Sequence, residues 1–154
     1  MREAELLDLF NTHSPMVYRL AYSYLRQPQD AEDAVQAVFL KLIDGTARPL
    51  PGKERAFLAQ ITVNHCKDQL RSVWKKRVGP LEEDVAFARQ EDQDLFFAVM
   101  ALPTKDRVVI YLHYYEGYSF GEIAVLLKVS SSAVSMRIHR ARNTLKKQLG
   151  EELP

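Results

Sequence analysis

The chain has 154 residues, which is enough for one medium domain or two small ones. Apolar residues make up 47% of it and charged residues 27%, a balance that supports a buried core and excludes an integral membrane protein. No apolar run approaches the roughly 20 residues needed to cross a bilayer, and the acidic, amphipathic N-terminus lacks the basic start of a signal peptide. Cys66 is the single cysteine, so no intrachain disulfide can form, and we expect a cytoplasmic protein without membrane insertion.

Charge is unevenly distributed along the chain, although the net charge is only +1. The segment Arg71–Arg77 holds four basic residues and no acid, Glu82–Asp94 holds six acids, and Val134–Gln148 holds five basic residues and no acid. Basic clusters raise the affinity for phosphate backbones whatever the total charge. The segregation favours a nucleic-acid partner, with ordinary solvated helix faces as the alternative reading.

Helical periodicity covers the first half of the chain. An apolar stripe starts near Leu6 and resumes after a predicted break at Pro15. Asp30 is expected to be the N-cap of a helix over Asp30–Ile43. The segment Asp44–Lys53 reads as a loop because it contains two glycines and two prolines. A further helix is predicted over Glu54–Lys76, with core candidates Phe57, Leu58, Ile61, Cys66 and Leu70.

The second half of the chain starts with an acidic segment, Arg77–Asp92, that is predicted to be a linker and is followed by more helices. Thr104 is expected to cap a helix with apolar residues Val108, Val109, Tyr111, Leu112 and Tyr115. Gly117 fits a helix end that needs a positive φ. Ser119 and Glu122 have the spacing of a capping box, and Ser130 is expected to cap the last helix. These patterns predict an all-α protein.

The segment from Phe120 to Leu149 carries the strongest functional signal, because it predicts a helix-turn-helix. Its first helix turns Ile123, Ala124 and Leu127 inward, and its second helix turns Val134 and Ile138 inward. The other face of the second helix is polar and basic, with Ser131, Ser132, Ser135, Arg137, His139, Arg140 and Arg142. Small polar residues can approach base edges, and arginines can bind guanine or phosphate. A plain helical hairpin with a basic face is the alternative.

Four strings in this chain resemble bacterial sigma factors. SFGEIAVLLKVSSSAVSMRIHRARNTLKKQL is similar to their fourth conserved region, and LPTKDRVVIYLHYYEGYS to the helix before it. DAEDAVQAVFLKLI resembles the core-binding helix of the second region, and FLAQITVNHCKDQLRSVWKKR the helix that follows. The order and the short linker resemble the extracytoplasmic-function (ECF) subgroup. The resemblance implies a region 2-like domain over residues 1–76, an acidic linker over 77–92 and a region 4-like helix-turn-helix domain over 93–154.

The same resemblance implies the division of labour between the two domains. The first would dock on core RNA polymerase through the exposed acidic side of the Asp30–Ile43 helix, with Asp30, Glu32, Asp33 and Gln36. It would also hold the melted −10 promoter element with Asn64, Lys67, Arg71, Trp74 and Lys75. Trp74 can stack on a base or belong to the core, and the pattern does not decide between them. The second would read the −35 promoter element through Ser132, Ser135, Arg137, His139 and Arg140.

The resemblance also implies an anti-sigma factor as a further partner, and a linker that passes through the polymerase; a solvated tether is the alternative for the linker. Two positions depart from the usual family pattern. Lys128 stands in the turn where the family usually has glycine, and Ser135 stands where a basic residue is common. A lysine in that turn adopts a positive φ only at some cost.

An enzymatic function is not supported by the sequence. The four histidines have no metal-ligand spacing with one another or with Cys66, and there is no phosphate-cradling glycine loop. His65 and Cys66 read as an exposed histidine beside a small buried residue rather than a thiol site. We therefore expect no cofactor, no metal and no small-molecule substrate. The alternatives left open are an autonomous helix-turn-helix regulator and an adaptor that binds a partner without reading DNA.

Overall fold

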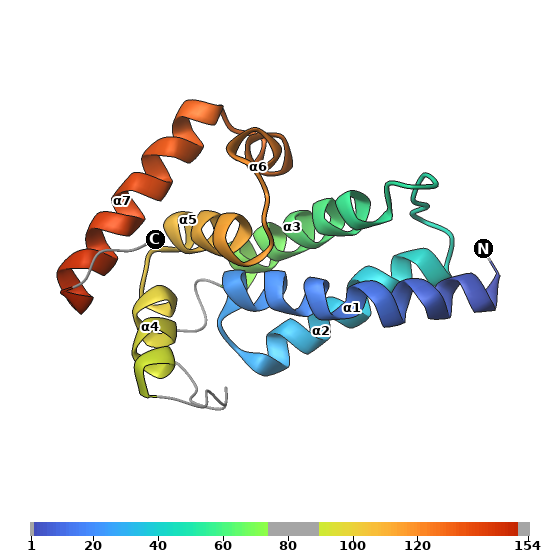
Figure 1. The fold of residues 1–154 in the computed structure, drawn as a ribbon. Helices are drawn as coiled ribbons and strands as arrows, with labels where there is room; N and C mark the ends of the chain where they lie inside the picture. The colour runs from blue at the N-terminus through green and yellow to red at the C-terminus, as the bar shows by residue number, and fades with distance from the viewer. Residues whose placement is uncertain (1, 74–89, 151–154) are drawn as a thin grey trace. The chain divides into compact units, whose positions relative to one another are not determined.

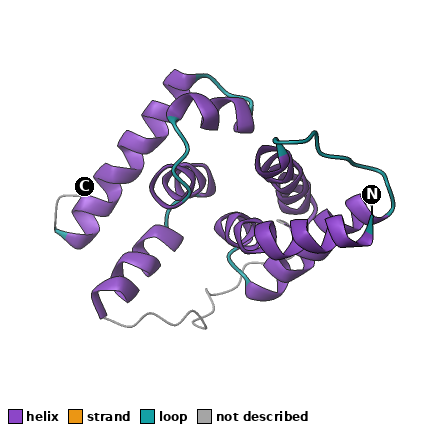
Figure 2. Ribbon diagram, turned by 45° about the vertical axis from the view of Figure 1, so that its right-hand side comes forward, coloured by secondary structure: helices purple, strands orange, loops and turns teal. Residues whose placement is uncertain are grey.

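The computed structural model describes residues 2–73 and 90–150, and every regular element in these two ranges is a helix (Figures 1 and 2). The chain divides into two compact units, residues 1–82 and 83–154. This confirms the predicted all-α fold with two small helical domains.

The first unit is built on α1 (Glu3–Leu25), α2 (Pro28–Ile43) and α3 (Glu54–Val73). The long helix α1 packs against both α2 and α3, and α2 also contacts α3. Buried residues come from all three helices: Met16, Val17, Leu20, Ala21, Tyr24, Ala31, Ala34, Val38, Phe39, Leu42, Leu58, Ala59, Val63 and Cys66. Phe57, Ile61 and Leu70, which were expected in the core, are only half-buried.

Two predictions for the first unit are wrong. The helix α1 continues through Pro15 without a break, because the lost hydrogen bond of a proline nitrogen is offset by the packing of the apolar residues that follow it. The helix α2 begins at Pro28, so Gln27 and not Asp30 is its N-cap. Proline suits this position, since its fixed φ is helical and an N–H there would have no acceptor within the helix. Asp30 lies in the first turn, where a carboxylate favours the helix dipole.

The second unit contains α4 (Gln90–Met100), α5 (Thr104–Ile110), a π-helical turn η1 (Tyr111–Tyr115), α6 (Phe120–Leu127) and α7 (Ser131–Leu149). The helix α7 packs against α4, α5 and α6. Its buried side consists of Val134, Ile138, Ala141 and Leu145. Burying a Val, Ile or Leu side chain stabilises a fold by about 1.5–3 kcal/mol, so this row anchors the outer face of α7 in a fixed direction.

The corner between α4 and α5 is held by a buried arginine. Arg107 donates from Nη1 to the carbonyl oxygen of Leu102 at 2.8 Å and from Nη2 to Thr104 Oγ1 at 3.2 Å. The prediction that Thr104 caps α5 is wrong. Pro103 is the N-cap, and Thr104 is the first helical residue. The arginine satisfies a carbonyl that follows the end of α4, which water cannot reach in the interior.

The π turn at the end of α5 overturns one further expectation. The Glu116 N–H donates to the Tyr111 carbonyl at 3.3 Å, five residues back, and this widens the turn. The apolar phase of the helix therefore ends at Leu112, and Tyr115 is exposed rather than part of the core. Gly117 follows with a φ of +77°, as predicted for the residue that ends this helix.

Candidate nucleic-acid interface

The helices α6 and α7 form the predicted helix-turn-helix, and hydrogen bonds at both N-termini fix where each begins. Ser119 Oγ accepts from the Glu122 N–H at 3.1 Å, and the Ser119 N–H donates to Glu122 Oε1 at 2.8 Å. Ser130 Oγ accepts from the Ala133 N–H at 3.0 Å. The capping box and the serine cap are therefore both confirmed.

The turn between the two helices is made by Lys128, Val129 and Ser130. Lys128 adopts left-handed angles, φ 60° and ψ 46°, where the family pattern usually has glycine. The Val129 N–H closes the turn on the Ala124 carbonyl at 3.0 Å. The turn thus keeps the geometry of a glycine C-cap with a lysine in it, at the steric cost that the Cβ atom brings.

The outer face of α7 presents polar and basic side chains to the surroundings. Ser132, Ser135 and His139 are exposed and Arg137 is half-buried. The helix contains no acidic residue from Ser131 to Leu149. A hollow of about 420 Å³ lies along this face and is lined by Phe120, Ser135, Ile138, His139, Arg142, Asn143 and Lys146. The result is a polar, cationic surface with small side chains at its N-terminal end.

The hollow is shaped by residues that the site prediction did not include. Arg142 donates from Nη1 to the hydroxyl of Tyr114 at 2.9 Å, which holds the guanidinium at the edge of the hollow. The imidazole of His113 packs on Phe120 with ring centroids 4.9 Å apart and steadies the start of α6. Asn143 and Lys146 follow His139 at spacings of four and seven residues. That helical spacing was the signal that could have identified them.

Arg140 differs from the other predicted DNA-binding residues because its guanidinium is already engaged within the unit. Nε lies 2.9 Å from Asp106 Oδ2 and Nη2 lies 2.6 Å from Asp106 Oδ1. The carboxylate is buried, with 2% of its side chain exposed, whereas 56% of the Arg140 side chain is exposed. The hydrogen bonds and the charge of Asp106 raise the pKa of Arg140. This bidentate ion pair joins α7 to α5 and fixes the rotation of α7 about its axis.

In the first unit, the exposed stripe of α2 combines acidic and apolar side chains. Glu32, Asp33 and Gln36 are exposed, as predicted, while Asp30 is half-buried. The stripe continues toward the end of the helix with Leu40, which is 56% exposed, and Ile43, which is 63% exposed. Neither residue was among the predicted polymerase-binding residues. Their spacing of four and seven from Gln36 places them on the same side of α2.

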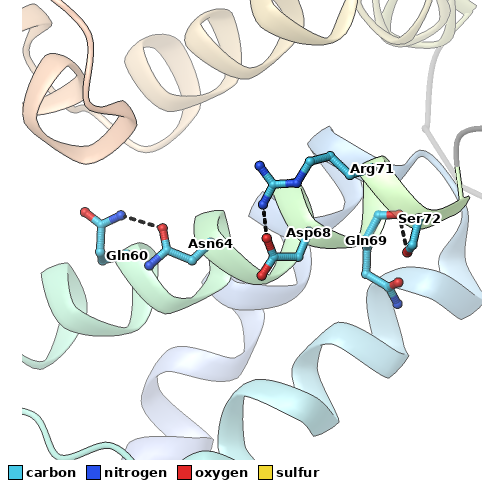
Figure 3. A network of polar contacts seen from close by, with 6 residues as sticks. All are labelled: Gln60, Asn64, Asp68, Gln69, Arg71 and Ser72. Atoms are coloured by element: carbon cyan, nitrogen blue, oxygen red, sulfur yellow. Dashed lines mark hydrogen bonds and ion pairs between the residues drawn. The ribbon is translucent and has the colours of Figure 1, made fainter.

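The predicted −10 residues follow the exposed side of α3. Gln60 Nε2 donates to Asn64 Oδ1 at 3.1 Å, and one turn further on Arg71 is paired with Asp68 (Figure 3). Both partners of this pair are largely exposed, so the pair contributes little to stability and opens at small cost. Lys67 is half-buried. Trp74 and Lys75 lie outside the described residues.

The loop that precedes α3 exposes an apolar side chain. Asp44 Oδ1 accepts from the Thr46 N–H at 2.9 Å, and hydrogen bonds from Thr46 lower the pKa of Asp44. Leu50 is 67% exposed. Residues 44–53 lie between α2 and α3 outside any helix, which confirms the predicted loop Asp44–Lys53.

The His65–Cys66 pair does not form a thiol site. Cys66 is buried, and burial raises the pKa of its thiol to about 12, which leaves almost no nucleophilic thiolate at neutral pH. His65 is half-buried rather than exposed as predicted, and desolvation together with the charge of Lys41 lowers its pKa. Among residues 2–73 and 90–150, no three His, Cys, Asp or Glu side chains gather closely enough to hold a metal ion.

Comparison with known proteins identifies the family. Residues 9–76 match the family model of sigma-70 region 2, and residues 93–145 match that of sigma-70 region 4. The chain is 33% identical to the RNA polymerase sigma factor CarQ of Myxococcus xanthus, over 94% of this chain and 88% of CarQ. It is 31% identical to the ECF RNA polymerase sigma factor SigM of Mycobacterium tuberculosis, over 93% and 76%. The chain belongs to the ECF RNA polymerase sigma factor family.

Further similarities agree with this family. The chain is 32% identical to the ECF RNA polymerase sigma factor SigE of Mycolicibacterium smegmatis over 94% of its own residues, and it spans 61% of the length of SigE. Its fold is similar to that of the sigma factor RpoE, solved with the anti-sigma factor NepR from Bartonella quintana, with a TM-score of 0.74, 22% identity and 98% of each chain covered. For CnrH, solved with the cytosolic domain of CnrY, the TM-score is 0.66 at 27% identity, covering 97% of this chain and 90% of CnrH.

Membership of this family confirms the resemblance of the four sequence segments to ECF sigma factors. Regions 2 and 4 of this ECF sigma factor fit promoter recognition at transcription initiation, and sigma factors are initiation factors rather than enzymes. Both points agree with the expected function of the chain. No helix within the two described ranges is long and apolar enough to span a bilayer.

Proposed function

We propose that this ECF sigma factor binds core RNA polymerase, directs it to promoters and takes part in melting them. The observation that carries the proposal is the outer face of α7, which has no acidic residue. Serine caps fix the N-termini of both α6 and α7, and so fix where this face begins. A recognition helix needs this combination of a fixed direction, small polar residues and cations to enter a major groove. We assign the region 2-like domain to residues 1–76, the linker to 77–92 and the region 4-like domain to 93–154.

We assign core polymerase binding to the exposed stripe of α2. Asp30, Glu32, Asp33 and Gln36 provide negative charge and hydrogen-bonding groups, which steer association with a basic surface. Leu40 and Ile43 extend the stripe with two exposed apolar side chains. A binding surface with a polar, charged part and an apolar part gains its on-rate from the first and its buried apolar area from the second.

We assign the −10 element to α3 and the residues after it, with Asn64, Lys67, Arg71, Trp74 and Lys75. Arg71 reaches a backbone phosphate by leaving Asp68, an exchange that costs little because the pair is solvated. We assign the −35 element to Ser132, Ser135, Arg137, His139 and Arg140. Within this set Arg140 acts mainly by holding α7 against Asp106, and its Nη1 atom lies outside that pair.

We also propose that an anti-sigma factor regulates this chain in the cytoplasm. One structure of similar fold contains such a partner: RpoE is bound to the anti-sigma factor NepR. Another, CnrH, was solved in complex with the cytosolic domain of CnrY. An inhibitor that covers the stripe of α2 would compete directly with core polymerase. Competition between the two partners for purified chain would test this assignment.

The deciding experiment is a pull-down of the full chain with bacterial core RNA polymerase, followed by run-off transcription from genomic fragments. We expect the chain to bind core polymerase and to produce discrete new start sites. Binding to duplex DNA without binding to core polymerase would instead identify an autonomous helix-turn-helix regulator. Binding to core polymerase without any new start site would identify an adaptor.

Two sets of variants separate the roles of the two units. Asp33→Arg combined with Gln36→Ala is expected to weaken core binding and to leave upstream DNA recognition unchanged. Arg137→Ala is expected to do the reverse. Arg140→Ala is a poor choice for this purpose, because it also removes the partner of the buried Asp106 carboxylate. Equal damage to both steps by both sets would contradict the assignment.

A further inference from the structure

One large apolar side chain stands on the outer face of α7 among polar neighbours. Met136 is 66% exposed, although Val134 and Ile138 on either side of it are buried. With 100° between successive residues, Met136 points almost directly away from the buried row of the helix. Ser132 lies one turn before it and His139 one turn after it, and both are exposed. Met136 is therefore the outermost side chain in the middle of the proposed recognition helix.

The surroundings of Met136 indicate what kind of partner covers it. The helix has no acidic residue, and its cations include Arg137 and Lys147. This charge favours a polyanion over an apolar protein surface. The side chains at the start of the helix are serines, which let the backbone of α7 approach closely. In the major groove of duplex DNA, the apolar feature that differs between bases is the C5-methyl group of thymine.

We propose that Met136 determines promoter specificity by packing its thioether on the C5-methyl group of a thymine in the upstream promoter element. The inference rests on the proposed function, since it requires α7 to enter the major groove. It adds a base-selecting contact that is apolar and therefore independent of the arginines. The flexible methionine side chain fits such a contact, because three rotatable bonds let it follow the position of the methyl group.

The test uses the full chain bound to core RNA polymerase. A duplex library randomised over the upstream region is first selected for binding. Each thymine of the selected element is then replaced by deoxyuridine, which removes only the methyl group. For the wild type we expect one position at which this replacement weakens binding about fourfold, the effect of losing one buried methyl group. In Met136→Ala, the weakening at this position should disappear.

Two control variants exclude indirect effects. Met136→Leu keeps an apolar side chain of similar volume and should retain the deoxyuridine effect. Val125→Ala truncates another apolar residue of the same unit, 77% exposed on α6, and should retain it as well. Because Met136 is exposed and alanine favours helices, Met136→Ala is expected to fold. Met136→Gln, of similar length but polar, provides a second variant that should lose the effect.

The outcomes separate this inference from the proposed function. A deoxyuridine effect of equal size in wild type and Met136→Ala at every thymine would overturn the role of Met136 and leave promoter recognition intact. A selected element without a thymine would do the same. If the complex selected no sequence at all, the proposed function and the inference would both be refuted.

Discussion

Replacing Lys128 with glycine is expected to stabilise the second unit. Lys128 is exposed and adopts φ 60° and ψ 46° as the C-cap of α6. In this region the Cβ atom of an L-residue approaches the following carbonyl oxygen, at a cost of about 1–2 kcal/mol. Glycine has no Cβ and removes that cost, while the hydrogen bond from Val129 to Ala124 that closes the turn stays in place.

The gain is partly offset in the unfolded chain. Glycine has more conformational freedom there and loses about 0.4–1 kcal/mol more on folding than a residue with a Cβ atom. The difference leaves a net stabilisation of roughly 0.5–1 kcal/mol. For a domain of this size, about 1 kcal/mol shifts the unfolding midpoint by about 4–8 °C. We therefore expect Lys128→Gly to raise the thermal midpoint of the second unit by a few degrees.

Differential scanning calorimetry of the full chain measures this shift. Lys128→Ala is the matched control, because it removes the same charged side chain but keeps the Cβ atom and its strain. Lys128→Gly should unfold at a higher temperature than both the wild type and Lys128→Ala. If the glycine and alanine variants unfolded at the same temperature, the reasoning from backbone strain would be refuted.

Three further predictions concern the Arg140–Asp106 pair, Cys66 and His65. Arg140→Ala should lower the thermal unfolding midpoint, because it leaves the buried Asp106 carboxylate unpaired. Arg137→Ala should leave the midpoint nearly unchanged. Equal midpoints for the two variants would contradict this reasoning. Cys66 should react with iodoacetamide at pH 8 far more slowly in the folded chain than in guanidinium, because its pKa is about 12; equal rates would show an accessible thiol. The pKa of His65 is lower in the folded state than in the unfolded state. The unfolded chain therefore binds this proton more readily, and stability should fall as the pH drops below about 6.5. The fall should be smaller in His65→Gln, and identical slopes in the two proteins would argue against the shift.

Local hydrogen-bonding patterns were predictable from the sequence where a residue type at a given spacing strongly prefers one structural role, such as a helix cap. Ser119 with Glu122 and Ser130 with the following turn were recognised as caps, because a serine hydroxyl at that spacing satisfies backbone N–H groups that have no other partner. The positive φ of Gly117 was recognised for the same kind of reason. The helix-turn-helix and its inward residues followed from these caps and from the apolar spacing.

Features decided by tertiary packing were not predictable in this way. Pro15 breaks helices in general, but here α1 continues because both of its neighbours pack along it. The pairing of Arg140 with Asp106 spans 34 residues of sequence, so no local pattern revealed it. Sequence alone therefore predicted a DNA contact for Arg140 and did not reveal its pairing with a buried carboxylate. Tyr115 is exposed because of the π turn, and no residue of the segment YLHYY predicts such a turn.

The two sides of α7 also bear on how promoter preference diverges between related copies of this chain. Stability depends on the inner row of Val134, Ile138, Ala141 and Leu145, whereas Ser132, Met136 and His139 are exposed on the outer side. If the outer side reads the promoter as proposed, substitutions there change the preferred sequence while the packing of the inner row stays intact. Under that proposal a duplicated copy could acquire a new set of target genes by this route, except through Arg140, whose substitution leaves the buried Asp106 carboxylate unpaired.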